Sequence, residues 1–230
     1  MLTKLPKAEH STLYVVVVAF FVTGLLVSNV IAVKTIQIGS VVLQAADLIF
    51  PITYIIGDIL TEVYGYKRAR KAIWIGFSCS LFAVMAITLG QYLPAHSDWH
   101  DQAAYDAILG SQWRIVAASF TAYLFGEFMN SYILAKMKIW TQGKYLWTRT
   151  IGSTVVGQAF DTTIFCLLAF WGVLPTDVLL SLIAFQWLFK VCYETAATPL
   201  TYLVVNGLKR HEGIDVYDRD TKFSPFALAE

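Results

Sequence analysis

Carboxylate side chains recur in segments of this sequence that are otherwise apolar enough to lie in a lipid bilayer. The stretch FPITYIIGDILTEVYGYKRARK, residues 50–71, carries Asp58 and Glu62 four residues apart, about one turn of a helix. An ionisable group at mid-depth in a membrane costs at least about 2.5–3.5 kcal/mol on insertion scales. Residues that bear this cost usually face a shared polar cavity and serve a function. The pattern therefore predicts a polar cavity inside a membrane protein.

Polar residues follow the same pattern in other apolar segments of the chain. A spacing of three or four residues places the polar side chains of one segment along one helical face. The candidate cavity residues are Asn29, Asp58, Glu127, Asn130, Gln158, Asp161, Lys190 and Glu194. Four of them are carboxylates and one is an amine, a surplus of 4 − 1 = 3 negative charges if all are ionised. Protonation, a cation or a ligand rich in hydrogen-bond donors must offset this surplus.

Several of these polar residues also have an interpretation in which they only support the fold. Lys190 and Glu194 lie four residues apart and can pair along one helix, which lowers the cost of both. Asn29, near the outer end of its segment, can serve as a hydrogen-bonding contact between helices or as a ligand. Glu62 lies close to the basic run KRARK, residues 67–71, and can form an interfacial salt bridge with it.

The composition is that of an integral membrane protein. Of the 230 residues, 57% are hydrophobic and only 14% are charged, against about 45–50% and about 25% in soluble domains. A span needs roughly 20 mostly apolar residues. Six segments qualify, and we predict an all-α bundle of six transmembrane helices forming a single domain over residues 1–230. The predicted spans are residues 13–33, 47–64, 72–93, 113–134, 151–173 and 178–205.

The connections between the spans carry the orientation signal. Basic residues gather in both tails, after the second span and around the connection between the fourth and fifth spans, whereas the opposite loops are rich in Asp. The positive-inside rule then predicts that both termini are cytoplasmic. The run KRARK is therefore interpreted as an orientation signal, and we expect no nucleic-acid partner. Residues 34–46 are too short to span and predict a small ribbon or a re-entrant piece.

Other kinds of chemistry have little support in the sequence. The three cysteines all fall in apolar segments and predict no disulfide framework. The chain has no glycine-rich phosphate loop and no HExxH zinc spacing, so we expect no metal site, no cofactor and no enzymatic activity. His96, Asp98 and His100 form the outer loop HSDWH, which is expected to be a solvated polar loop. The first apolar run is too long for a cleavable signal peptide and is expected to be a span.

Six stretches of the sequence together resemble a known family. They are SN…K at residues 28–34, DLIFPITYIIGDILTEVYGYKRARKAIWIGF at 47–77, R…AS…E…N at 114–130, W.RT.GST..GQ..DT at 147–162, K…E…P..Y at 190–202 and LKRHEGIDVYD at 208–218. This pattern resembles the queuosine precursor transporters of the vitamin uptake transporter family, over nearly the whole chain. The resemblance implies import of 7-cyano-7-deazaguanine, and secondarily its 7-aminomethyl relative, across the bacterial inner membrane. It also implies a fold similar to the six-helix substrate-binding subunits of energy-coupling-factor vitamin importers.

The substrate that the resemblance implies fits the chemistry of the predicted cavity. A deazaguanine presents a ring N–H beside an exocyclic amine, and one carboxylate can accept both in a bidentate pair. Amides such as Asn130 or Gln158 can hold the carbonyl edge, and aromatic rings can stack on the flat base. The sequence does not decide which of the four carboxylates reads the base.

Three other functions are consistent with the sequence. The chain can be the binding subunit of an ATP-energised importer, although it has no ATP-binding motif of its own. It can also be an intramembrane enzyme whose carboxylates act as acid and base, or a structural membrane subunit without a ligand. Proton coupling and facilitated diffusion followed by metabolic trapping both stay open as energy sources, as do a homo-oligomer and an energising partner.

Overall fold

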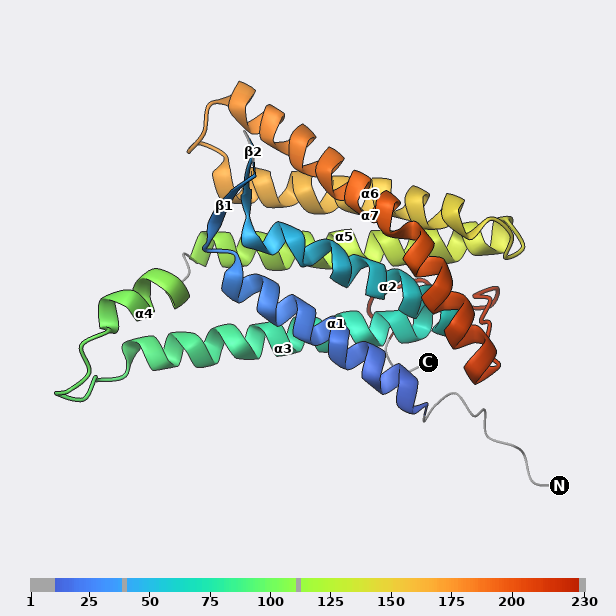
Figure 1. Cartoon of the computed structure of the whole chain (residues 1–230), viewed down its shortest axis with the longest axis horizontal. Helices are drawn as coiled ribbons and strands as arrows, with labels where there is room; N and C mark the ends of the chain where they lie inside the picture. Colours follow the sequence, from blue (N-terminus) through green and yellow to red (C-terminus); the bar gives the residue numbers. More distant parts are fainter. Residues whose placement is uncertain (1–10, 39–40, 111–112, 228–230) are drawn as a thin grey trace.

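Helices make up most of the computed structural model, which describes residues 11–38, 41–110 and 113–227 (Figure 1). Four helices, α1, α3, α6 and α7, are long and apolar enough to cross a membrane. This architecture confirms the predicted class of a helical membrane protein. The helices in chain order are α1 (Thr12–Ile31), α2 (Phe50–Tyr64), α3 (Tyr66–Tyr92), α4 (Gln102–Leu109), α5 (Trp113–Trp140), α6 (Leu146–Phe170) and α7 (Thr176–Glu212).

Each predicted span coincides with one of the six longer helices, but two lengths differ from a standard crossing. Helix α2 has 15 residues, or about 22 Å at 1.5 Å per residue, and a 3₁₀ turn, η2 (Ala45–Leu48), precedes it. Pro51 lies in the first turn of α2, where its missing N–H costs nothing. Helix α7 has 37 residues, about 55 Å, and extends well beyond a hydrocarbon core of about 30 Å.

The segment after α1 forms the predicted ribbon. Strands β1 (Thr35–Ile38) and β2 (Val41–Gln44) pair antiparallel, with Ile36 opposite Leu43. Helix α4 lies within the outer loop between α3 and α5, where no span was predicted. It is tied back to α3, because Tyr105 Oη donates a hydrogen bond to the carbonyl of Ile87 at 3.1 Å.

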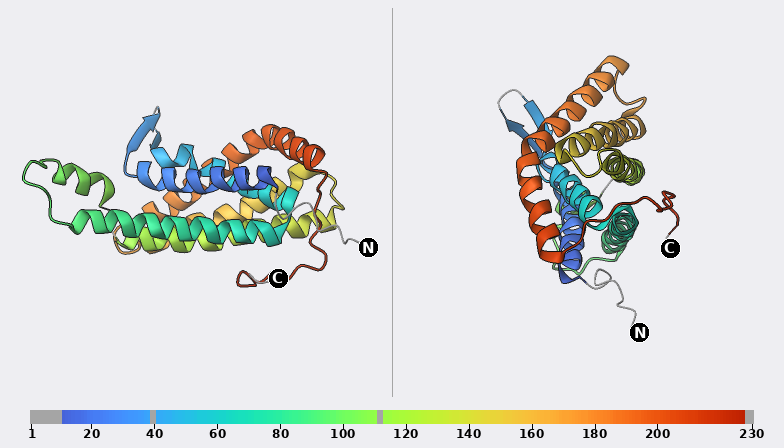
Figure 2. Two further views of the ribbon diagram at one scale, coloured as in Figure 1. Left: turned by 90° about the horizontal axis from the view of Figure 1, so that it is seen from below. Right: turned by 90° about the vertical axis from the view of Figure 1, so that its right-hand side faces the viewer.

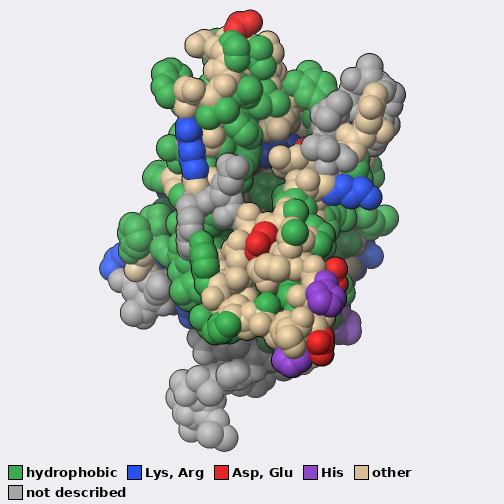
Figure 3. Space-filling model, turned by 90° about the vertical axis from the view of Figure 1, so that its left-hand side faces the viewer, with side chains coloured by type: hydrophobic (Ala, Val, Ile, Leu, Met, Phe, Trp, Pro, Cys, Tyr) green, Lys and Arg blue, Asp and Glu red, His purple; other side chains and the backbone are tan. Residues whose placement is uncertain are grey.

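The connections alternate between the two ends of the bundle (Figure 1). The hairpin, α4 and the α6–α7 connection lie at one end. The α2–α3 and α5–α6 connections lie at the other end, where α1 begins and the segment after α7 packs. This is the alternation that the distribution of basic residues predicts. Figure 3 faces the end of the bundle that carries the hairpin, α4 and the α6–α7 connection, and hydrophobic side chains lie mostly around the sides of this view.

Helices α5 and α6 pack side by side (Figure 2). At this interface one glycine of each helix lies directly against the other helix. A Cβ on Gly126 would lie 2.7 Å from the Cβ of Asp161, and a Cβ on Gly157 would lie 2.6 Å from the Cβ of Asn130. Neither position has room for a side chain. The close approach brings polar residues of α5 and α6 into direct contact.

The segment after α7 returns along the bundle and docks beside α3 (Figure 2). Arg70 is buried there and donates to the carbonyls of Lys222 at 2.9 Å and Ser224 at 2.7 Å. Trp74 Nε1 donates to the carbonyl of Pro225 at 2.8 Å. Arg70 belongs to the KRARK run, so one of these basic residues has a structural role beyond an orientation signal.

Candidate functional site

Polar side chains from α2, α5, α6 and α7 meet inside the bundle. Seven of the eight candidate residues predicted from the sequence are buried there: Asp58, Glu127, Asn130, Gln158, Asp161, Lys190 and Glu194. Asn29 is different, because its side chain is exposed on α1 while its neighbour Ser28 is the buried one. The structure therefore does not bring Asn29 into the cluster.

A polar seam joins α2 to α5. Asn130 Nδ2 donates a hydrogen bond to Asp58 Oδ1 at 2.7 Å. One turn further along, Thr61 Oγ1 donates to Ser131 Oγ at 3.0 Å. All four side chains are buried, so each of these two hydrogen bonds lowers the free-energy cost of burying its polar groups.

A second seam joins α6 to α7. Lys190 Nζ lies 2.8 Å from Asp161 Oδ2 and also donates to Thr162 Oγ1 at 3.3 Å. The lysine is therefore paired across the helix interface with Asp161, and the pairing with Glu194 along α7 that its spacing suggested is wrong. The helix interface brings Asp161 closer than the same-helix neighbour, and a buried ammonium ion needs a partner at contact distance.

Glu194 is instead held by two uncharged donors of α6. Thr154 Oγ1 donates to its Oε2 at 2.7 Å, and Gln158 Nε2 donates to its Oε1 at 2.6 Å. Both carboxylate oxygens thus receive a hydrogen bond, in the bidentate manner in which the edge of a base could also be held.

A small cavity lies between these seams. Its volume is about 10 Å³, roughly the room that one water molecule needs. Its wall is formed by residues of α2, α6 and α7, and two of the predicted carboxylates belong to it, Asp58 and Glu194. The lining residues are Ile55, Asp58, Thr150, Ile151, Thr154, Glu194, Thr198 and Thr201. Pockets for small molecules usually measure about 300–1,000 Å³, so this arrangement is closed.

Several polar atoms of the cluster have no hydrogen-bond partner among the residues that the structure describes. They are both carboxylate oxygens of Glu127, the hydroxyl of Tyr54, and the amide oxygens of Asn130 and Gln158. Buried polar atoms are normally paired, so such a group is expected to interact with something that the helices themselves do not supply.

Glu62 belongs to a separate charge cluster at the end of the bundle where α2 meets α3. Its fully buried carboxylate accepts from Arg149 Nε at 2.7 Å and from Arg149 Nη2 at 2.8 Å. Lys209 Nζ lies 2.5 Å away, and Lys138 Nζ, 3.6 Å away, completes the set. The interpretation in which Glu62 pairs with the KRARK run is therefore wrong, because α5, α6 and α7 supply the cations.

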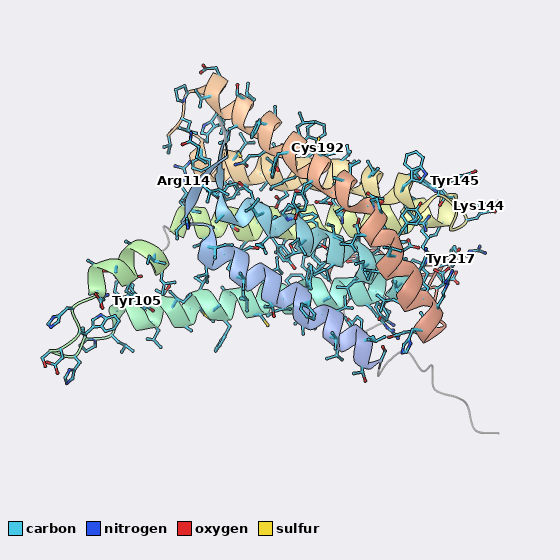
Figure 4. The ribbon with its side chains drawn as sticks, in the orientation of Figure 1. Tyr105, Arg114, Lys144, Tyr145, Cys192 and Tyr217 are labelled. Carbon is cyan, nitrogen blue, oxygen red and sulfur yellow. The ribbon has the colours of Figure 1, made fainter. Side chains whose placement is uncertain are left out.

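The segment after α7 closes this charge cluster, beside the residues labelled Lys144, Tyr145 and Tyr217 in Figure 4. Asp215 Oδ1 lies 2.6 Å from Lys138 Nζ and 2.9 Å from Lys209 Nζ. Partial burial raises the pKa of Asp215, but the hydrogen bonds from the two lysines outweigh it and hold the pKa below its usual value. Sequence spacing could not reveal this cluster, because spacing relates residues within one helix and the cluster joins residues of several. The available signal was the presence of Lys138 and Arg149 beside apolar segments.

Comparison with known proteins identifies relatives of the chain. A family profile described as "Putative vitamin uptake transporter" matches residues 44–204, which include every candidate residue except Asn29. A "Probable queuosine precursor transporter" of Bacillus subtilis (strain 168) is 32% identical over 179 residues, 76% of this chain and 77% of the relative.

Two further relatives match over shorter stretches. The "Queuosine precursor transporter" of Escherichia coli (strain K12) is 25% identical over 122 residues, 53% of this chain and 52% of that protein. A "Probable queuosine precursor transporter" of Haemophilus influenzae is 24% identical over 124 residues, 54% of this chain and 50% of the relative. No solved structure matches the chain.

Proposed function

This chain belongs to the vitamin uptake transporter family, and we propose that it imports the queuosine precursor 7-cyano-7-deazaguanine across the bacterial inner membrane. The family and the relatives are transporters and not enzymes, which agrees with the expected absence of catalysis. The relatives' names supply the substrate class, a queuosine precursor. The choice of the cyano compound, with the 7-aminomethyl compound as a second substrate, is part of the proposal.

The observation that carries the proposal is the pair of carboxylates in the cavity wall. Asp58 and Glu194 face the same small space from α2 and α7. Either carboxylate can accept the ring N–H and the exocyclic amine of a deazaguanine together. Asp161 is a weaker candidate for this role, because Lys190 already neutralises it. The position of Asp58 and Glu194 in the cavity wall supports them as the carboxylates that read the substrate.

The amides near this wall suit the other edge of the base. Gln158 gives its N–H to Glu194, and Asn130 gives its N–H to Asp58. A base that displaces either contact would free an amide N–H for its own carbonyl oxygen. The rings of Phe50 and Tyr54 lie 5.5 Å apart at centroid distance on α2, and an aromatic ring of this kind can stack on a flat base.

Transport through this site requires the cavity to open. A space of about 10 Å³ does not hold a bicyclic base, so α2, α6 and α7 must separate on at least one side of the membrane. We propose six spans in a single domain over residues 1–230, with both termini cytoplasmic and a fold like that of energy-coupling-factor substrate-binding subunits. The alternation of the connections and their basic residues support this topology.

The proposal is tested in cells that lack both this protein and the synthesis of queuosine precursors. The chain is restored, nanomolar 7-cyano-7-deazaguanine is supplied, and queuosine is assayed in tRNA. We expect restoration by the unsubstituted chain and by Asp98→Asn, whose side chain is 89% exposed. We expect loss of uptake in Asp58→Asn, in Glu194→Gln or in both, with the protein still inserted in the membrane.

Two results would change the assignment. Normal uptake in both carboxylate variants would remove the cavity wall from substrate recognition. No uptake by the inserted, unsubstituted chain would favour another small planar substrate or a missing energising partner. Co-purification with an ATPase complex would identify the second of these. A rise in melting temperature of the purified chain with the base would show binding directly.

A further inference from the structure

Glu127 has an environment unlike that of the other three carboxylates of the cluster. Its side chain is 1% exposed, and neither oxygen has a hydrogen-bond donor among the described residues. Asp58, Asp161 and Glu194 each accept at least one hydrogen bond from a neighbouring helix. Glu127 is therefore the one member of this set that the surrounding helices leave uncompensated.

The groups that face Glu127 make its ionised form still less favourable. Helix α2 faces it with Tyr54 and Asp58, α6 with Asp161 and α7 with Glu194, all within electrostatic reach. These are three carboxylates and one phenol, and the lysine of the cluster is bonded to Asp161. An ionised carboxylate that is buried without a donor or a cation is strongly disfavoured and takes up a proton instead.

The packing of α2 on α5 also depends on the state of Glu127. Its carboxyl group lies directly against Gly57 of α2, so closely that a Cβ at Gly57 would displace it. A neutral carboxyl group tolerates this apolar contact with the helix backbone. An ionised group needs water or a donor, and it can reach either only if α2 moves away from α5.

We propose that Glu127 is the proton-binding site that couples substrate import to the pH gradient, an inference that rests on the proposed function. A proton from the outer side binds the Glu127 carboxylate and permits the closed contact with Gly57. The same proton leaves to the cytoplasm when α2 and α5 separate, so one proton crosses with each substrate molecule. Glu127 on α5 and Asp58 on α2, one of the two carboxylates proposed to read the substrate, lie on either side of the same α2–α5 contact, which links proton binding to substrate binding.

The protonation state can be read without any substrate. Infrared spectra of the purified chain are compared for the unsubstituted protein, Glu127→Gln and the exposed control Asp98→Asn at neutral pH. We expect the carbonyl stretch of a protonated carboxyl group in the unsubstituted protein and in the control, and its loss in Glu127→Gln. Identical spectra for all three proteins would overturn the proposal. Failure of Glu127→Gln to fold would also contradict it, because glutamine reproduces the neutral group.

Coupling is measured in proteoliposomes with labelled 7-cyano-7-deazaguanine and a pH gradient, at zero membrane potential. One proton per substrate predicts about tenfold accumulation per unit of pH difference, since one pH unit corresponds to a factor of ten. We expect Glu127→Gln to lose the response to the gradient, and Glu127→Asp, which keeps a titratable group, to retain it. Accumulation driven by sodium in place of protons, or a full response in Glu127→Gln, would refute the coupling role.

The two measurements separate this inference from the substrate assignment. If the infrared band depends on Glu127 but the unsubstituted chain neither binds nor accumulates the base, the substrate is wrong and the proton site stands. If the base enters only until its concentrations inside and outside are equal, and the infrared band does not depend on Glu127, the substrate assignment stands and the proton site is wrong.

Discussion

Neutralising Glu62 should destabilise the bundle far more than neutralising an exposed carboxylate. Glu62 is fully buried and accepts two parallel hydrogen bonds from Arg149, while Lys209 and Lys138 complete its cation neighbours. In Glu62→Gln, Arg149 and Lys138 stay 1% exposed with their main counter-charge removed. Asp215 alone then balances the cations, from a side chain that is 43% exposed.

The expected magnitude follows from the cost of breaking a buried ion pair. Removing one partner of such a pair costs about 3–5 kcal/mol, because the other charge remains buried without compensation. For a chain of this size, 1 kcal/mol corresponds to roughly 2–4 °C, so the melting temperature should fall by roughly 6–20 °C. Asp98→Asn changes charge equally at an 89% exposed side chain and should shift stability by less than about 0.5 kcal/mol.

The assay is thermal unfolding of the purified chain in detergent, with a double substitution to isolate the pair. Glu62→Gln combined with Arg149→Met removes both charges, and it should be more stable than Glu62→Gln alone. The coupling energy should reach about 0.5–3 kcal/mol. A melting temperature of Glu62→Gln equal to that of the control, or strictly additive single effects, would refute the reasoning.

Three further substitutions test other contacts. Gly126→Ala should separate α5 from α6 and abolish uptake, since its Cβ would lie 2.7 Å from an α6 side-chain carbon. The control Gly207→Ala, whose Cβ would enter open space, should leave uptake intact. The pKa of Asp215 is lowered, so its contribution to stability is present at neutral pH and lost as pH falls through that pKa. The melting-temperature difference between the unsubstituted chain and Asp215→Asn should accordingly vanish in acid. Arg70→Lys keeps the charge but loses the planar guanidinium group, whose Nη1 donates to two tail carbonyls, and should cost about 1.5–3 kcal/mol in thermal unfolding. The exposed swap Lys71→Arg should cost nothing measurable.

The helices could be predicted because their signal is local. A run of apolar residues long enough to cross a bilayer must satisfy its backbone as a helix. Each of the six predicted spans coincides with a helix, and four of the described helices are long and apolar enough to cross a membrane. Helix α4 gave no such signal, because it is short and lies in a polar loop. Its position depends on contacts with α3, such as the bond from Tyr105 to Ile87, which no local pattern contains.

The candidate site could be predicted as a set, but not its pairings. Spacing of three or four residues fixes which side chains share a face, and the faces of α2, α5, α6 and α7 did converge. Spacing cannot say which neighbour a charge meets across an interface. Lys190 therefore pairs with Asp161 and not with Glu194 on its own helix. Asn29 has no polar companion at helical spacing in its span, so no pattern in the chain indicates which way its side chain faces.

The charge count of the cluster explains why these carboxylates are not equivalent. Of the surplus of three negative charges counted above for the fully ionised set, the proposed proton on Glu127 removes one, and Lys190 offsets Asp161. The other two carboxylates, Asp58 and Glu194, both line the cavity. They are held only by uncharged donors, Asn130 for one and Thr154 with Gln158 for the other. A ligand that brings N–H donors supplies the partner that the helices lack, and a deazaguanine presents such donors at its edge. The different surroundings of these four carboxylates thus support the proposed division into a structural ion pair, a proton site and a substrate-recognition wall.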